Sequence, residues 1–187
     1  MVIFQKNFGL AIDFCCVWGI IILIVGESGY FWTKVDEFSS NLTERMMKML
    51  IGEYEHSIDT KGRIIFPVKL REGLGEKFIV TKGLDNCLFV YSLTEWERLE
   101  QKIKELPMVK GGAVQKFLFA SASLVEADKQ GRILIPANLR SYAGLDKDVV
   151  VIGVSVRAEI WDKARWEELC SKLTSDVIGE AMEELGF

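Results

Sequence analysis

Short apolar runs alternate with polar turns through most of the chain, a pattern typical of a protein built from short strands. The first two runs, residues 54–58 and 64–66, predict strands that are joined by a polar turn ending at Gly62. Glycine suits this place because the last residue of such a turn takes a positive φ. Two later runs, residues 78–80 and 88–91, predict two further strands.

Helical signals separate and follow these strands. Pro67 ends the second strand and can begin a short helix, and Gly75 suits the end of that helix. Ser92 fits the N-cap of a longer helix, which Pro107 ends. Apolar residues at helical spacing predict one buried face on this helix: Leu93, Trp96, Leu99, Ile103 and Leu106.

The same set of elements occurs twice. Residues 59–71 read DTKGRIIFPVKLR and residues 128–140 read DKQGRILIPANLR, with seven of thirteen positions identical at an offset of 69. Each stretch is followed by two apolar runs and a helix, which carries Trp96 in the first copy and Trp166 in the second. Gly153 lies near the expected last turn of the second copy. The chain therefore contains two tandem copies of one unit, and we expect both tryptophans to be core residues.

Each copy holds only about 45 residues, which is near the lower limit for independent folding. We therefore expect the two copies to interleave or to pack together in an α+β fold that is mainly β. Short strands leave unpaired edges, so association between chains is a further expectation. The predicted domains are an N-terminal extension at 1–48, a first unit at 53–95, a helical connector at 96–121, a second unit at 122–167 and a C-terminal helix and tail at 168–187.

The first 48 residues differ in composition from the rest. Residues 8–26 are apolar, with Asp13 as their one charge, and the uncharged run 14–26 is shorter than the roughly 20 residues that span a bilayer. Three alternatives remain: a membrane anchor, a degenerate secretion signal, or an upstream stretch outside the working protein. We favour the third, in which translation starts at Met46, Met47 or Met49.

Composition and charge narrow the class of protein. Hydrophobic residues make up 49% and charged residues 27% of the chain, which excludes a disordered or collagen-like protein. The formal net charge is -4, so any binding of nucleic acid needs a local basic patch. The four cysteines and one histidine exclude a tetrahedral zinc site and a disulfide scaffold, and they indicate a reducing, cytosolic compartment. These residues are Cys15, Cys16, Cys87, Cys170 and His56.

We find no convincing catalytic set. His56 stands alone in a predicted strand without a recognisable nucleophile motif, and the chain has no phosphate-binding glycine loop. Asp59 and Asp128 lie beside basic residues, which favour the ionised carboxylate and argue against an acid catalyst. The sequence therefore predicts no enzyme, no metal and no cofactor, although a small enzyme that uses His56 stays as an alternative.

The basic residues of the two turns are better candidates. Lys61 and Arg63 flank Gly62, and Lys129 and Arg132 flank the pair Gln130-Gly131 in the second copy. A two-stranded ribbon fits the major groove of DNA, where arginine can donate two hydrogen bonds to guanine and lysine can hold phosphates. More basic residues follow a turn or so further on, namely Lys69, Arg71 and Arg140.

The alternative for these turns is structural. Asp59 with Arg63 and Asp128 with Arg132 can form ion pairs that only stabilise the turns, and exposed pairs of this kind are common. Both roles can hold at once if the aspartate keeps the arginine in a rotamer that points toward DNA. Spacing alone leaves the choice open.

The two turns also carry a resemblance to a known family. From residue 49 the chain begins MLIGEYEHSIDTKGRIIFP, and its second motif lies in EADKQGRILIPANLRSYAGL. Both stretches resemble the MraZ family of bacterial regulators, whose D-x-x-x-R motif falls here on residues 59–63 and 128–132. The resemblance covers residues 49 to about 173, around two-thirds of the chain. The family lacks the first 48 residues, which strengthens the upstream-start alternative.

The resemblance implies tandem SpoVT-AbrB-like units, each similar to half of a swapped-hairpin barrel, in a ring-like homo-oligomer that often has eight subunits. It implies a protein of the cytoplasm and nucleoid that binds G-rich direct repeats in double-stranded DNA and usually represses its own division and cell-wall operon. The arginines Arg63 and Arg132 would then be the main DNA contacts, with Lys61 and Lys129 as helpers. The motif-supporting residues would be Asp59, Asp128, Gly62 and Gly131.

Two other functions remain open beside the regulator and the small enzyme. One is a membrane-associated protein anchored by residues 8–26. The other is an AbrB-like antitoxin with a toxin partner, against which the tandem units argue because we expect such antitoxins to carry one unit per chain.

Overall fold

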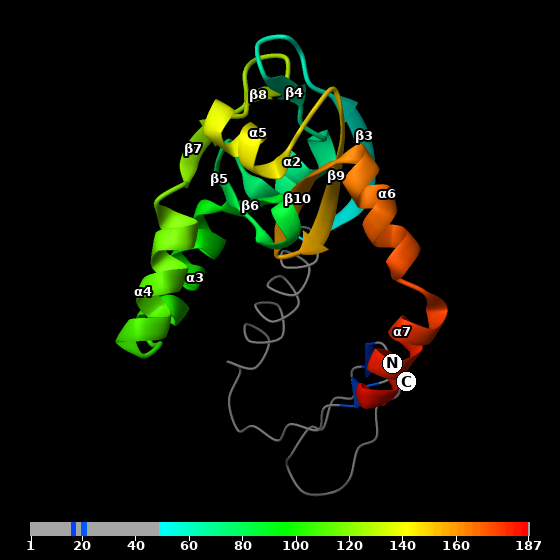
Figure 1. Cartoon of the computed structure of the whole chain (residues 1–187). Helices are drawn as coiled ribbons and strands as arrows, with labels where there is room; N and C mark the ends of the chain where they lie inside the picture. The colour runs from blue at the N-terminus through cyan, green and yellow to red at the C-terminus, as the bar shows by residue number, and fades with distance from the viewer. Residues whose placement is uncertain (1–15, 18–19, 22–48, 187) are drawn as a thin grey trace, which may run out of the picture. The chain divides into compact units, whose positions relative to one another are not determined.

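The computed structural model has two parts, which divide between Met46 and Met47 (Figure 1). It describes residues 16–17, 20–21 and 49–186. In the first part, β1 (Cys16–Val17) pairs antiparallel with β2 (Ile20–Ile21). All further elements belong to the second part.

The three alternatives for the N-terminal 48 residues, including the anchor at residues 8–26, concern a segment that lies outside the described residues apart from β1 and β2. Within the described ranges, no helix is both long enough and apolar enough to cross a membrane.

The second part alternates short strands with short helices, as the sequence pattern predicts. Its strands are β3 (Leu50–Ser57), β4 (Arg63–Ile65), β5 (Lys77–Lys82), β6 (Leu88–Ser92), β7 (Ser123–Glu126), β8 (Arg132–Leu134), β9 (Asp148–Ser155) and β10 (Arg157–Asp162). Its helices are α2 (Val68–Leu74), the 3-10 helix η1 (Leu84–Asn86), α3 (Leu93–Lys104), α4 (Met108–Phe119), α5 (Ala137–Ala143), α6 (Lys163–Lys172) and α7 (Ser175–Glu184).

The two copies exchange strands. Six strands form one antiparallel sheet in the order β3-β9-β10-β6-β5-β7, and β4 pairs with β8 in a separate two-stranded sheet. The first-copy strand β3 thus lies beside the second-copy strand β9, and the second-copy strand β7 lies beside the first-copy strand β5. The α+β class and the tandem AbrB-like units are confirmed, and the copies are interleaved.

The core is common to both copies. Phe66 and Phe78 from the first copy are fully buried, and so are Ile133, Ile135 and Leu139 from the second. They belong to one continuous apolar cluster, which includes residues from both sheets and from the short helices. A single copy has too little apolar surface for such a core, so interleaving follows from the short length of each unit.

Local signals place most helix ends as expected. Ser92 caps α3, since its hydroxyl accepts a hydrogen bond from the Glu95 amide over 3.2 Å. The helix ends before Pro107, as predicted, and Pro107 caps α4. Pro67 stands at the N-cap of α2, one residue before the first helical position, and Gly75 ends that helix with a φ of 89°.

The helical stripe and the tryptophans are only partly core. On α3, Ile103 is buried, whereas Leu93 is 43% exposed. Trp96 is half-buried and packs between Tyr91 and Phe119. Outside this helix the tryptophan of α6, Trp166, is also half-buried and packs on Trp161. Both rings contact other aromatic side chains, which favours the core interpretation over a stacking surface for a ligand.

Gly153 has a role that the sequence pattern does not predict. It lies inside β9, opposite Gly52 of β3, and the turn to β10 follows at Val156. A Cβ at Gly153 would lie 2.4 Å from the backbone nitrogen of Ile51. Glycine is therefore required here by the close approach of two backbones rather than by a turn.

Candidate functional site

Two tight turns form the candidate site, the first between β3 and β4 and the second between β7 and β8. In the first turn, the Gly62 amide donates a hydrogen bond to the Asp59 carbonyl oxygen over 2.9 Å. Gly131 makes the matching bond in the second turn over 2.8 Å. The two glycines have φ values of 80° and 74°, which confirms the predicted glycine turns.

The aspartate of each turn collects both backbone and side-chain donors. Oδ1 of Asp59 accepts hydrogen bonds from the amides of Lys61 and Arg63, each over 2.9 Å. Oδ2 of Asp59 accepts from Nε of Arg63 over 2.8 Å and lies 2.7 Å from Nη2. Asp128 repeats this arrangement in the second turn, with Arg132 in the place of Arg63.

These donors keep both carboxyls ionised. The amide and the guanidinium of Arg63 lower the pKa of Asp59 to about 2. The guanidinium and the amide of Arg132 lower the pKa of Asp128 to about 2. Neither carboxyl can act as a proton donor near neutral pH, and the ion pairs expected from the spacing are present.

The two turns flank one short β-ribbon. Antiparallel pairing of β4 with β8 places Arg63 opposite Leu134 and Arg132 opposite Ile65, so the turns lie at opposite ends of this ribbon, on the side of the fold that carries it (Figure 1). We call residues 59–63 and 128–132 the paired turns. The side chains of Arg63 and Arg132 are 29% and 31% exposed. Each arginine is thus fixed by its aspartate and still accessible to solvent. Its ion pair can therefore stabilise the turn and also hold the guanidinium in position for a ligand.

The copies also hold each other's turn. The Phe66 amide of the first copy donates to the Gly131 carbonyl oxygen over 2.9 Å, and the Ile135 amide of the second copy donates to the Gly62 carbonyl oxygen over 3.0 Å. Each turn is thus hydrogen-bonded to the opposite copy, and the β4–β8 ribbon links the two turns.

Two arginines at the paired turns have positions that sequence reasoning missed. The guanidinium of Arg140 packs against Gly62, and that of Arg71 packs against Gly131. Each arginine thus belongs to the turn of the opposite copy. The repeat motif does end on these two residues, but a local pattern cannot tell that strand exchange carries each helix to the other turn.

Comparison with known proteins gives a consistent result over this part of the chain. A family model described as "MraZ protein, putative antitoxin-like" matches residues 49–113 and 118–184. The chain belongs to the MraZ family. It is 58% identical over 143 residues to a protein of Acetivibrio thermocellus named Transcriptional regulator MraZ. Proteins of the same name from Thermoanaerobacter sp. (strain X514) and Clostridium botulinum (strain Alaska E43 / Type E3) are 56% identical over 143 residues and 52% identical over 142 residues. In each case the match covers 74% of this chain and 100% of the relative.

Each half of the MraZ match contains one of the paired turns. The first matched segment, residues 49–113, includes Asp59 to Arg63, and the second, residues 118–184, includes Asp128 to Arg132. The matched halves follow the sequence repeat, whereas the sheet mixes the copies, with β3 beside β9, β10 beside β6 and β5 beside β7. Residues 1–48 lie outside both matched segments.

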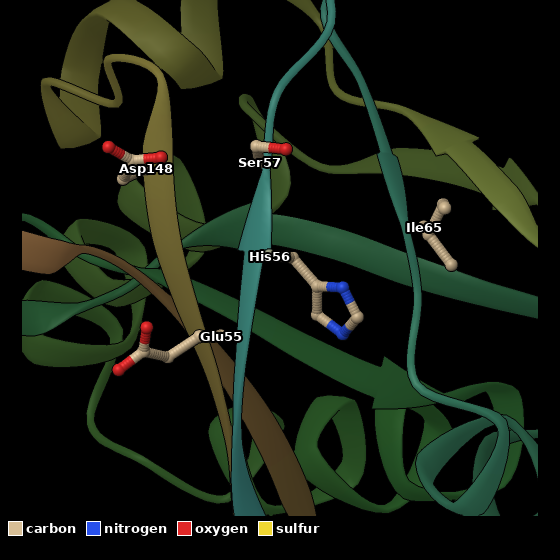
Figure 2. Close-up of a pocket in the computed structure, with 5 residues that line it drawn as sticks. All are labelled: Glu55, His56, Ser57, Ile65 and Asp148. Atoms are coloured by element: carbon tan, nitrogen blue, oxygen red, sulfur yellow. The ribbon is translucent and has the colours of Figure 1, made fainter.

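A shallow hollow beside the first turn of this MraZ-family chain contains His56. It has a volume of about 340 Å³ and is lined by Glu55, His56, Ser57, Ile65 and Asp148. Figure 2 shows the imidazole on the side of Ile65, while the Glu55 carboxylate points to the other side of the strand. Partial burial lowers the pKa of His56 and favours the neutral ring. The His56 side chain forms no hydrogen bond with another described residue, so this geometry provides no support for a catalytic pair.

No other described residues form a competing site. Among residues 49–186 with β1 and β2, no group of histidine, cysteine and acidic side chains could hold a metal ion. Cys87 is buried, and burial raises the pKa of its thiol to about 12, which keeps the thiol protonated and unreactive. The paired turns are thus the best-supported candidate within the described part of the chain.

Proposed function

We propose that this chain is a sequence-specific DNA-binding transcriptional regulator that represses its own division and cell-wall operon through G-rich direct repeats. One observation carries the proposal: two aspartate-held arginines, Arg63 and Arg132, begin the two strands of one β-ribbon in a fold whose relatives are named Transcriptional regulator MraZ. Its expected partner is double-stranded DNA, and no catalytic residue, metal or cofactor takes part.

The geometry suits recognition of guanine. A two-stranded ribbon such as β4 and β8 fits the major groove, and arginine can donate two hydrogen bonds to O6 and N7 of guanine. Asp59 and Asp128 occupy Nε and one edge of each guanidinium, which fixes the direction of the remaining N–H groups. Reduced rotamer freedom lowers the entropy lost on binding, so the aspartates support recognition without touching DNA.

The lysines and glycines of the turns have supporting roles. Lys61 and Lys129 would bind phosphates beside the bases that the arginines contact. Gly62 and Gly131 allow the tight turn that brings each arginine to the surface. The proposed working units are residues 53–95 and 122–167, joined by the connector 96–121 and followed by the tail 168–187.

A ring-like homo-oligomer reconciles the acidic chain with DNA binding. The formal charge of the whole chain is -4, so a single subunit has no general attraction for DNA. We propose a ring of eight subunits. Such a ring would present several paired turns toward DNA. Neighbouring subunits could then bind successive direct repeats, which raises the effective concentration of the second contact. The proposed location is the cytoplasm, at the nucleoid.

Binding of the full chain to a labelled duplex tests this function. We expect tight binding to a duplex of G-rich direct repeats, weaker binding to a scrambled duplex of equal length, and affinity that falls as salt rises. Arg63→Ala should remove the preference for the G-rich duplex. Arg98→Ala is a matched control, because Arg98 forms an ion pair with Glu95 on α3, away from the paired turns (Figure 1).

Two results would contradict the proposal. One is the absence of binding by a folded, assembled chain to any G-rich repeat. The other is an equal loss of binding in the Arg63 and Arg98 variants, which would assign the interaction to general charge rather than to the paired turns.

A further inference from the structure

Four arginines gather around the paired turns, and they differ in their ionic partners. Arg63 and Arg132 each form an ion pair with the aspartate of their own turn, with 2.7 Å between Nη2 and Oδ2 in both pairs. Arg71 and Arg140 form no ion pair with any carboxylate of the described residues. The charge of the first two is compensated within the protein, whereas the charge of the last two is not.

Arg71 and Arg140 lie directly on the turns. A Cβ on Gly62 would lie 2.5 Å from Cζ and 2.8 Å from Nε of Arg140. A Cβ on Gly131 would lie 2.7 Å from Nη2 and 2.9 Å from Cζ of Arg71. The absence of a side chain at each glycine therefore leaves the space in which the guanidinium of the opposite copy sits.

Most hydrogen-bond donors of these two arginines have no acceptor in the described structure. Nε of Arg71 donates to the Phe66 carbonyl oxygen over 3.2 Å. Nε of Arg140 is buried and has no hydrogen-bond partner among the described residues. Both residues are half-buried, so part of each arginine is open to solvent. A guanidinium with uncompensated charge and donors at a surface is suited to phosphate.

We propose that Arg71 and Arg140 bind DNA phosphates, each beside the turn of the opposite copy. Different arginines then supply the positive charge and recognise the bases. The inference rests on the proposed function. Arg63 and Arg132, held by aspartate, recognise bases but add little net charge. Arg71 and Arg140 attract the backbone and, through Gly62 and Gly131, sit beside the arginines that recognise bases.

The local charge supports this division. The paired turns and the two helix arginines hold six basic side chains and two carboxylates, a formal charge of +4 in a chain of -4. Arg71 and Arg140 contribute half of that local charge. At ordinary salt, interactions over more than about 8–10 Å are largely screened, so a bound phosphate responds to these local charges rather than to the distant charges that make the chain acidic. The side chains counted are Lys61, Arg63, Arg71, Lys129, Arg132 and Arg140, with Asp59 and Asp128.

Salt-dependent DNA binding by the full chain separates the two roles. Arg140→Gln and Arg71→Gln should weaken binding to G-rich and scrambled duplexes by the same factor. The slope of log affinity against log salt should become shallower by about 0.9 for each lost phosphate contact. Arg140→Lys should keep the wild-type slope, because lysine also binds phosphate. The control Arg98→Gln changes the charge of the chain equally and should leave the slope unchanged.

A charge-neutral variant tests the other half of the division. The double change Asp59→Ala with Arg63→Ala removes the base-recognition pair without changing net charge. It should reduce the preference for the G-rich duplex about tenfold or more, with the salt slope unchanged. Circular dichroism and thermal unfolding would show that each variant is folded. If Arg140→Gln fails to fold, Arg71→Gln and Arg140→Lys still give the comparison.

Failure of this inference differs from failure of the proposed function. A wild-type chain that binds no duplex contradicts the proposed function itself. A wild-type chain that binds, while both glutamine variants keep its salt slope and its affinity for the scrambled duplex, overturns the phosphate role. Arg71 and Arg140 would then only support the turns.

Discussion

At the scale of single residues, Gly62 meets two separate demands. Its φ of 80° lies in the left-handed region that side chains with a Cβ rarely adopt. Its missing side chain also leaves room for the Arg140 guanidinium. The first demand was predictable from the polar turn pattern around Gly62. The second was not, because Arg140 comes from the other copy and reaches Gly62 only after the strands are exchanged.

Gly62→Ala should therefore destabilise the chain by roughly 1–3 kcal/mol, through backbone strain and displacement of Arg140. Urea unfolding at fixed protein concentration measures this change. Gly112→Ala is the matched control, since a Cβ at Gly112 meets nothing within 4 Å and the residue lies in α4. It should leave stability unchanged or raise it by up to about 1 kcal/mol. Equal effects of the two changes would contradict this account of Gly62.

The ion pair of the first turn makes a prediction about pH. Since the folded pKa of Asp59 is about 2 and its ordinary value is 3.8, the ion pair stabilises the fold fully above about pH 4. That stabilisation is lost as the pH falls toward 2. A carbon-13 NMR titration of the carboxyl groups should give a pKa of about 2 for Asp59. Arg63→Ala should raise this pKa and leave that of Asp128 at about 2. An Asp59 pKa near 3.8 in the unmodified chain would show that the pair does not form in solution.

At the scale of elements, the sequence predicts where strands and helices lie but not which strands pair. Strands and helices were predictable, because turn glycines, prolines and caps act within a few residues. Partner strands were not, since β3 could satisfy its backbone beside either copy. The pairing of β3 with β9 depends on a core from both copies and on the two facing glycines, Gly52 and Gly153.

Gly153→Ala tests that pairing. The new Cβ would meet the backbone of Ile51 and Leu50, which cannot rotate away as a side chain can. We expect a loss of roughly 1–3 kcal/mol in the free energy of unfolding, together with faster amide exchange in β3. Gly179→Ala, at a helical position with no atom within 4 Å, should show neither effect. Unchanged exchange in β3 would mean that the two strands do not approach as closely as described.

At the scale of the whole molecule, the interleaved copies should be unable to fold apart as monomers. Residues 49–121 alone would leave β5 and β3 without their partners β7 and β9. Circular dichroism and sedimentation should find no cooperative unfolding transition in a monomer of 49–121 or of 122–187. Mixing the two halves should restore the fold. A half that unfolds cooperatively as a monomer would contradict the interleaving.

The central claim is that the paired turns are the surface that meets DNA. Amide hydrogen exchange of the full chain, with and without a duplex of G-rich direct repeats, tests it most directly. The account predicts slower exchange at residues 59–63 and 128–132 in the complex, and no change in α3 and α4. Protection confined to α3 and α4, with the paired turns unaffected, would contradict it.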